Sequence, residues 1–279
     1  MSVINTNLAS LNAQRNLSTS SSSLNTSIQR LSSGMRVNSA KDDAAGLSIA
    51  TKMDSQIRGM NQAIRNANDG ISMAQTADGG LSTAIDALQR MRELAVQGGN
   101  QTIPDGATEK DRINLNKEFS QLHDELERIA KDTKFNGQAI LSTSSAAASI
   151  QVGADADSTT IDVPATDLET VASTMKTAAA NLDDRDASKD AITAIDAALA
   201  SINEMRADLG AVQNRLGFAV SNLQSASENQ SAAKSRIMDT DFAAETAKLT
   251  RGQILQQAGT AMLAQANSAP NGVMALLRG

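Results

Sequence analysis

The sequence predicts a mainly α protein: an elongated rod of long antiparallel helices, a coiled-coil-like bundle, with a small β-hairpin. Its two ends are expected to pair as an α-helical coiled coil. Two observations lead to this prediction. Apolar residues recur with heptad spacing over long stretches, and the 279 residues are 41% hydrophobic but only 1% aromatic. Because a globule of this size normally uses aromatic rings as core fillers, small aliphatic side chains must pack here, which favours closely spaced helices.

The first long helix is expected over residues 57–95, where apolar residues alternate at gaps of three and four. Unbroken, it would be about 58 Å long at 1.5 Å per residue. Gly79-Gly80 interrupts the pattern and Gly98-Gly99 ends it. Arg92 occupies a seam position, so we expect an interhelical or intersubunit salt bridge there. The two repeating positions read Ile57, Ile64, Ile71, Asp78, Ile85, Arg92 and Met60, Ala67, Ala74, Leu81, Leu88, Ala95.

A shorter helix follows, with His123 expected on its surface beside Leu122. Its end is marked by Asn136-Gly137, which suits a turn with positive φ. The apolar stripe that predicts this helix is Leu115, Phe119, Leu122, Leu126 and Ile129.

The centre of the chain differs in composition from the flanking seams. Ile150–Gly153 and Thr159–Val163 alternate as short strands and predict a hairpin. Residues 167–182 could form one more helix. A second long apolar seam then predicts a long helix. After Leu223, the residues at the seam positions are polar. That seam is Ile192, Ile195, Leu199, Ile202, Arg206, Leu209, Gln213, Leu216, Val220 and Leu223.

Both ends of the chain carry weaker seams. They are helical in pattern but too polar to be stable alone, so we expect terminal helices that are disordered in the free chain and order on binding a partner. Asp42-Asp43 and Asp239–Asp241 are expected to cap helices or form turns. The N-terminal seam consists of Ile4, Leu8, Leu11, Leu17, Leu24, Ile28, Leu31 and Met35, and the C-terminal seam of Phe242, Leu249, Leu255, Met262, Val273, Leu276 and Leu277.

Composition excludes several kinds of chemistry. The chain has no Cys, and its single His cannot supply an HExxH or multi-His zinc site. A net charge of −6 argues against nucleic-acid binding. No apolar run approaches the roughly 18 residues of a membrane span, and the N-terminus lacks the features of a cleavable signal. We therefore expect no enzyme, catalytic residue, metal or cofactor.

Five separated blocks resemble the sequence signature of bacterial flagellins, in the family's order. They are Arg30–Gly46, Arg65–Ser72, Gln89–Gln97, Asp208–Arg215 and Gln253–Gly259, the last followed by Leu263–Asn267. The resemblance covers roughly residues 1–140 and 190–279. Since flagellins commonly insert variable outer domains in between, the short centre here resembles a minimal flagellin with little or no outer domain.

The resemblance implies a subunit that is secreted by type III export and polymerises into the extracellular flagellar filament for swimming motility. Residues 1–45 with 240–279 would form the terminal coiled-coil domain of the filament core. Residues 46–140 with 188–239 would form a helical rod, and 141–187 the short central hairpin and linker. Implied partners are further copies of the chain, the export machinery, a flagellin chaperone at the C-terminal region, and the filament cap and hook-junction proteins.

The resemblance also implies that an innate-immune Toll-like receptor recognises the monomer. The matching contact positions are Arg90, Leu94 and Glu118, within a surface that includes Gln89, Arg92, Glu93 and Gln97. A solvated helix face with ordinary i,i+3 and i,i+4 ion pairs is the alternative for these charged residues.

Three other classes of protein share some of these sequence features. A hook–filament junction protein shares flagellin-like ends but should lack the full set of central blocks. A cytoplasmic helical-hairpin signalling module would explain the Ala-rich heptads but not the terminal blocks. A flagellin with an inserted enzyme domain needs a longer centre than this chain has.

Overall fold

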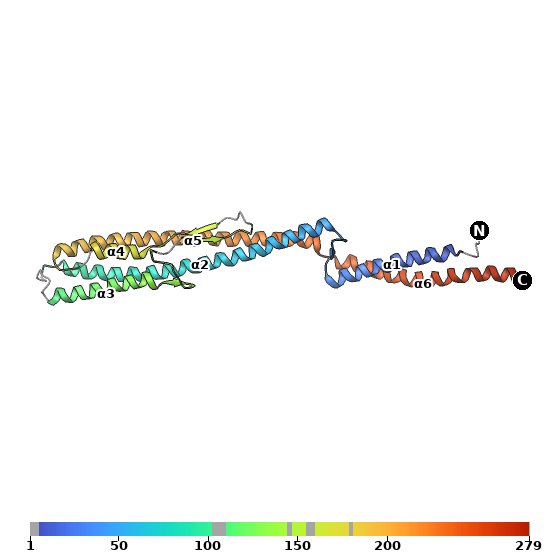
Figure 1. The fold of residues 1–279 in the computed structure, drawn as a ribbon, viewed down its shortest axis with the longest axis horizontal. Coiled ribbons are helices and arrows are strands. Elements are labelled where there is room, and N and C mark those ends of the chain that lie inside the picture. The colour runs from blue at the N-terminus through green and yellow to red at the C-terminus, as the bar shows by residue number, and fades with distance from the viewer. Residues whose placement is uncertain (1–5, 102–109, 144–146, 155–159, 179–180, 279) are drawn as a thin grey trace. The chain divides into compact units, whose positions relative to one another are not determined.

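The computed structural model describes residues 6–101, 110–143, 147–154, 160–178 and 181–278, without the side chains of Ala178 and 269–278. These residues form mostly helix (Figure 1), which confirms the predicted fold class. None of the described helices is both long and apolar enough to cross a bilayer. The helices are α1 (Leu8–Ser33), α2 (Ala44–Gly98), α3 (Lys110–Asp132), α4 (Leu168–Ala178), α5 (Arg185–Met238) and α6 (Phe242–Arg278). The strands are β1 (Lys134–Phe135), β2 (Gln138–Ala139), β3 (Ala148–Gln151) and β4 (Thr160–Val163).

The chain divides into two compact units. The terminal unit consists of residues 1–55 and 228–279, and the central unit of residues 56–227. The boundaries between the two units fall within α2, after residue 55, and within α5, before residue 228. The limits expected from the sequence were residues 45 and 240.

In the central unit, α2 and α5 are antiparallel and joined by ion pairs. Asp78 Oδ1 accepts from Arg206 Nε at 2.6 Å, and Asp196 Oδ1 accepts from Arg92 Nε at 2.7 Å. From the first pair to the second, the residue number increases along α2 and decreases along α5, which shows that the two helices run antiparallel. The interhelical salt bridge expected at Arg92 is confirmed.

The core of the central unit follows one of the two predicted columns of α2. Every member of the column from Met60 to Ala95 is at most 6% exposed. The column that begins at Ile57 lies at the rim, where its Ile residues are half-buried and Arg92 is exposed. The heptad spacing was therefore predicted correctly, but only one of the two predicted columns is buried. The second buried column, which the sequence did not predict, is Ala63, Gly70, Ala77, Ala84 and Met91.

Gly79-Gly80 does not interrupt α2, contrary to what the pattern suggested. A Cβ on Gly80 would lie 2.8 Å from Leu141 Cδ1 and 3.1 Å from Thr133 Oγ1, whereas one on Gly79 would meet nothing within 4 Å. Gly80 thus permits the segment after α3 to approach α2 closely.

His123 is buried, which corrects the prediction that it lies on the helix surface. It is 6% exposed, and its Nε2 lies 3.0 Å from the carbonyl oxygen of Ala172 in α4. Leu122, its neighbour, is only half-buried. The apolar stripe that includes Leu122 correctly predicted the helix α3. However, α4 packs against the face of α3 that carries His123, the residue after Leu122.

Two short hairpins complete the central unit. Asn136 (φ 50°) and Gly137 (φ 81°) form the β1–β2 turn, as predicted from the Asn-Gly pair. β3 and β4 pair antiparallel with Ile150 opposite Ile161, which confirms the second hairpin, although its expected residues 155–159 lie outside the described part.

Buried polar contacts hold the segment between α4 and α5 against α3. Arg112 is fully buried, and its Nη1 donates to the carbonyl oxygen of Leu182 at 2.7 Å. Asn116 Nδ2 donates to Asp183 Oδ1 at 2.7 Å. Sequence reasoning did not single out Arg112, because charged residues are rarely fully buried.

In the terminal unit, α1 and α6 pair antiparallel through small residues. A Cβ on Gly252 would lie 3.2 Å from Leu24 Cδ1, and one on Gly259 would lie 3.1 Å from Leu17 Cδ1. The two leucines and the two glycines are each one heptad apart, so each leucine packs onto the backbone of α6 at a glycine.

The turns of the terminal unit are formed by capping residues. Gly34 ends α1 in the left-handed conformation (φ 72°). Asp43 Oδ1 accepts from the backbone N–H of Gly46 at 2.7 Å, and Asp241 Oδ1 accepts from that of Ala243 at 2.9 Å. Backbone and side-chain hydrogen bonds from Ser39 lower the pKa of Asp42. The predicted roles of these aspartates as caps and turn formers are confirmed.

Candidate functional site

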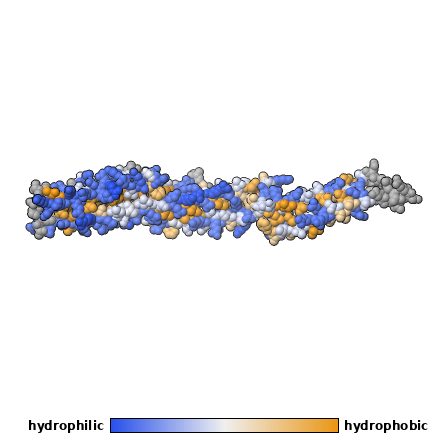
Figure 2. All heavy atoms as spheres, turned by 90° about the horizontal axis from the view of Figure 1, so that it is seen from below, coloured by the Kyte–Doolittle hydropathy of each residue, from blue (hydrophilic) through white to orange (hydrophobic). Residues whose placement is uncertain are grey.

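The terminal unit exposes a set of large apolar side chains, here called the terminal apolar surface. Figure 2 shows apolar residues gathered over α1 and α6, in contrast to the mostly hydrophilic surface over the central unit. Leu8 and Met262 are each 66% exposed. Exposed apolar side chains that gather on one part of a soluble protein indicate an interaction site. The members are Leu8, Leu11, Ile28, Met35, Ile49, Phe242, Ile254, Leu255 and Met262.

The helices of the terminal unit have little interior of their own. Among the described residues, its buried hydrophobic side chains are Leu24, Val37 and Ala50. Besides the packing of Leu17 and Leu24 onto the two glycines of α6, the α1–α6 contact includes hydrogen bonds. Ser27 Oγ donates to Glu245 Oε1 at 2.7 Å, and Asn7 Nδ2 donates to the carbonyl oxygen of Ala266 at 2.7 Å. Several large apolar residues of the pair stay exposed.

The seam residues predicted from the sequence fall into three groups. Leu24 is buried, and Leu17, Leu31 and Leu249 are half-buried. Ile4 and the side chains of Val273, Leu276 and Leu277 lie outside the described part. The exposed members are Leu8, Leu11, Ile28, Met35, Phe242, Leu255 and Met262.

Sequence reasoning missed two members of the terminal apolar surface: Ile49 and Ile254. Ile49 lies in α2 before the first predicted seam begins at Ile57, and Ile254 directly precedes the seam residue Leu255. The predicted terminal seams included Met35, which forms a bridge with Asp239, and Phe242, which begins α6.

A second candidate surface is charged and lies on the central unit. Arg90 Nη1 donates to Glu93 Oε2 and Arg90 Nη2 to Glu118 Oε1, each at 2.8 Å. We call these three residues the Arg90 network. It joins α2 to α3 and is about half exposed. The hydrogen bonds with Glu93, then Glu118, raise the pKa of the Arg90 guanidinium.

Most of the receptor positions implied by the resemblance surround this network. Gln89, Arg92, Glu93 and Gln97 are exposed, and a shallow groove of about 460 Å³ is lined by Gln89, Arg92, Glu93 and Val96. Leu94 differs from them, because it is 2% exposed and belongs to the hydrophobic core. The structure thus brings Arg90 and Glu118 together at the surface and places Leu94 beneath it.

These features define a class of protein: a helical protein with a hydrophobic core in its central unit and large exposed apolar side chains on its terminal unit. The sequence profile of the bacterial flagellin N-terminal helical region matches residues 4–146, and that of the C-terminal helical region matches residues 192–277. The chain belongs to the bacterial flagellins.

Similar proteins agree with this assignment. The chain is 46% identical over 276 residues to the flagellin of Halalkalibacterium halodurans, covering 99% of this chain and 100% of that one. It is 42% identical over 289 residues to the flagellar filament 33 kDa core protein of Treponema phagedenis, with coverage of 99% and 100%. The crystal structure of Bacillus cereus flagellin matches with a TM-score of 0.50 and 36% identity, over 61% of this chain and 94% of that one.

Family membership decides between the classes of protein considered from the sequence. The chain is a structural subunit of the extracellular bacterial flagellar filament, where it polymerises with copies of itself, and it is not an enzyme. A full-length match to a flagellin of the same size supports a minimal form. The cytoplasmic signalling module and the inserted enzyme domain are set aside.

Proposed function

We propose that the subunit polymerises through its terminal apolar surface, with α1 and α6 gaining their stability from neighbouring copies in the filament core. The exposure of Leu8, Leu11, Ile28, Leu255 and Met262 carries this proposal. Fully burying one such side chain contributes about 1.5–3 kcal/mol, so several of them offset the cost of ordering the two helices. Folding of the termini is then coupled to assembly.

The test is nucleated polymerisation of purified protein, followed by electron microscopy. Leu255→Ser combined with Met262→Ser should abolish filament growth, while helical content in solution changes little. Ile113→Ser is the matched control, since Ile113 is 46% exposed on the central unit. Normal filament growth by the double variant would contradict the proposal.

We propose domain limits for this assembly. Residues 1–45 with 240–279 would be the filament-core domain, 46–140 with 188–239 the rod, and 141–187 a central segment in place of an outer domain. Removing residues 240–279 should leave the central unit protected from limited proteolysis but prevent polymerisation. Loss of protection in the central unit would contradict these limits.

We also propose that the chain is exported unfolded, with its C-terminal region bound by a flagellin chaperone before export. The filament cap and hook-junction proteins would then contact the incoming and the first subunits. The absence of Cys and the near absence of aromatic residues suit passage through a narrow channel.

A disulfide across α1 and α6 tests export of the unfolded chain. A Cβ on Gly252 would lie 3.5 Å from Leu24 Cβ, within the separation that a disulfide requires. In cells with an oxidising cytoplasm, Leu24→Cys with Gly252→Cys should block secretion but not synthesis. Each single variant is the control, and secretion of the oxidised double variant would contradict the proposal.

We propose, second, that a Toll-like receptor recognises the monomer through the Arg90 network. Arg90 presents a guanidinium that two carboxylates hold in one orientation, and a half-exposed Arg of fixed orientation is a common interface anchor. Leu94 would contribute by supporting α2 from below rather than by direct contact, since it is buried.

Receptor signalling by purified monomers tests this second proposal. Arg90→Ala and Glu118→Ala should each reduce signalling at least about tenfold, as expected for an interface anchor. Arg128→Ala is the matched control, because Arg128 is 57% exposed on α3 and pairs with Glu125 in the same i,i+3 manner. Unchanged signalling by Arg90→Ala combined with Leu94→Ala would contradict it.

A further inference from the structure

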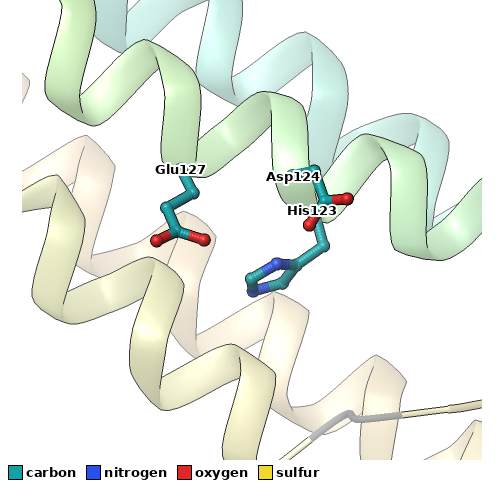
Figure 3. Close-up of side chains that lie close together, drawn as sticks. All are labelled: His123, Asp124 and Glu127. Carbon is teal, nitrogen blue, oxygen red and sulfur yellow. The ribbon is translucent and has the colours of Figure 1, made fainter.

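Three side chains of α3 turn toward one another on the side that α4 covers. The potential ligand atoms of His123, Asp124 and Glu127 all lie within 4.8 Å of one another (Figure 3). His123 is buried, Glu127 is half-buried and Asp124 is exposed, so the group opens from the helix interface to solvent. Neither filament assembly nor the Arg90 network uses these residues.

The imidazole of His123 is held in one orientation by α4. Its Nε2 lies 3.0 Å from the carbonyl oxygen of Ala172. A carbonyl can only accept, so Nε2 carries the proton, and in the neutral ring Nδ1 then has a free lone pair. Metal-binding histidines are typically oriented in this way, by donating the other ring N–H to a carbonyl or carboxylate.

Two potential ligand groups of this cluster are uncommitted. Within the ranges that the structure describes, Asp124 forms no ion pair or hydrogen bond, and the hydrogen bond of His123 uses Nε2 alone. A histidine that is 6% exposed thus directs its remaining ring nitrogen into a group with two carboxylates. A buried lone pair next to two carboxylates is unfavourable unless a proton or a metal cation lies between them.

We propose that His123 Nδ1, Asp124 and Glu127 bind a divalent transition-metal ion, of which Zn²⁺ is the best match. One imidazole nitrogen with two carboxylate oxygens suits Zn²⁺ better than Mg²⁺ or Ca²⁺, which prefer oxygen ligands alone. Three protein ligands leave a fourth position for water on the side of Asp124. In tetrahedral coordination the ligand atoms come to roughly 3.4 Å apart, so the carboxylates close in by rotation of exposed side-chain bonds.

Two lysines compete with the ion for Glu127. Lys131 Nζ lies 2.5 Å from Glu127 Oε1, and Lys176 Nζ lies 3.8 Å from Glu127 Oε2. Binding of the metal must displace both ammonium groups from this carboxylate, so each lysine weakens the site. The competition also yields a specific expectation: removal of Lys176, which is 63% exposed on α4, should tighten metal binding.

The ion would also strengthen the packing of α4 on α3. The metal fixes Nδ1, and the Nε2–H of the same ring holds the Ala172 carbonyl. Because a ligand that binds only the folded form stabilises it, Zn²⁺ should raise the thermal stability of the central unit. Zn²⁺ binding by this cluster in the central unit does not depend on how the terminal unit assembles.

Titration of the full-length monomer with Zn²⁺, followed by calorimetry, tests the proposal. We expect one ion per chain. Asp124→Asn should weaken binding at least about tenfold, the scale found for groups around a metal centre. Because Asp124 is exposed, this substitution should leave the fold intact. Glu127→Gln should weaken binding similarly, and Lys176→Met should tighten it. Glu125→Gln is the matched control, since Glu125 lies on the same helix and pairs with Arg128.

The single histidine supplies a second, spectroscopic readout. Because the chain has no other His, the imidazole proton resonances belong to His123 and should shift on addition of one equivalent of Zn²⁺. Resonances that do not move with up to millimolar Zn²⁺ would overturn the proposal. So would Zn²⁺ binding that Asp124→Asn and Glu127→Gln both leave unchanged, since the ion would then lie elsewhere.

Discussion

The terminal and central units are both helical, but they use apolar residues in opposite ways. The central unit buries whole columns of α2 and α5, together with α3, α4 and the hairpins, in one continuous core. The terminal unit buries only Leu24, Val37 and Ala50 among its described hydrophobic residues and leaves nine large apolar side chains exposed. The first unit has a hydrophobic core of its own, and we propose that other copies complete the second.

The difference shows that helix pairing and helix stability are separable. In the terminal unit, Gly252 and Gly259 allow α1 and α6 to approach closely, and Ser27, Asn7 and Glu245 provide hydrogen bonds across the pair. These contacts fix the register but bury little area. In the central unit the same antiparallel arrangement is accompanied by extensive apolar burial, so we expect its fold not to depend on assembly.

The strongest test of the comparison truncates one leucine in each unit. Leu88→Ala should destabilise the central unit by about 2–5 kcal/mol, because Leu88 is fully buried and its loss leaves a cavity. Leu255→Ala should change monomer stability by less than about 0.5 kcal/mol, because Leu255 is 52% exposed. Urea unfolding followed by circular dichroism measures both. Equal losses would show that the two units are stabilised alike.

A matched pair of glycines probes how tightly the central unit is packed. Gly80→Ala should cost about 1–3 kcal/mol, since the new methyl group overlaps Leu141. Gly79→Ala, one residue away, should instead add up to about 1 kcal/mol, because it meets nothing and favours the helix. Thermal unfolding of the two variants gives the comparison. A gain in stability at Gly80 would contradict the close approach.

The terminal unit should be the more sensitive of the two to acid. Burial raises the pKa of the Glu245 carboxyl, but hydrogen bonds from Ser27 and Lys248 outweigh it, so the net pKa lies below the ordinary 4.5. The ionised form therefore stabilises the α1–α6 contact above pH 4.5, and this contribution disappears as the pH falls through the lowered value.

Hydrogen exchange of α1 and α6 amides at pH 6 and pH 3 measures this effect. Protection should fall in acid. The fall should be smaller in the Glu245→Gln variant, because the glutamine side chain does not titrate. Ser27→Ala should reduce protection already at pH 6. A pH response that is identical in the wild type and in Glu245→Gln would assign the acid sensitivity to other groups.

The smallest effect is expected at the salt bridges between α2 and α5. Arg206→Met should cost about 1 kcal/mol or less, because the Arg206–Asp78 pair is more than one-third exposed and screened by water. Chemical denaturation at low and high salt checks this value. A loss of several kcal/mol would mean that charge pairing, rather than apolar burial, dominates the central unit.

Much of the fold could be predicted because heptad spacing is a local property. The seams of α2 and α5, the Asn136-Gly137 turn and the β3–β4 hairpin each follow from neighbouring residues. The prediction failed for His123, whose surroundings depend on where α4 packs. It could not foresee the metal-binding cluster either, because a motif search looks for several histidines, and here one histidine is oriented by a carbonyl distant in sequence.

For the candidate sites, too, some features follow from the sequence and others depend on tertiary packing. The sequence alone determined that the ends are helical, weakly apolar and suited to assembly, because the residue pattern fixes the face of each helix. Only the tertiary structure decided that Leu94 is buried while Arg90 meets Glu118 on another helix, and that Gly80 carries a close contact while Gly79 does not. A periodic pattern states which side of a helix is apolar, but the neighbour that covers this side comes from elsewhere in the chain.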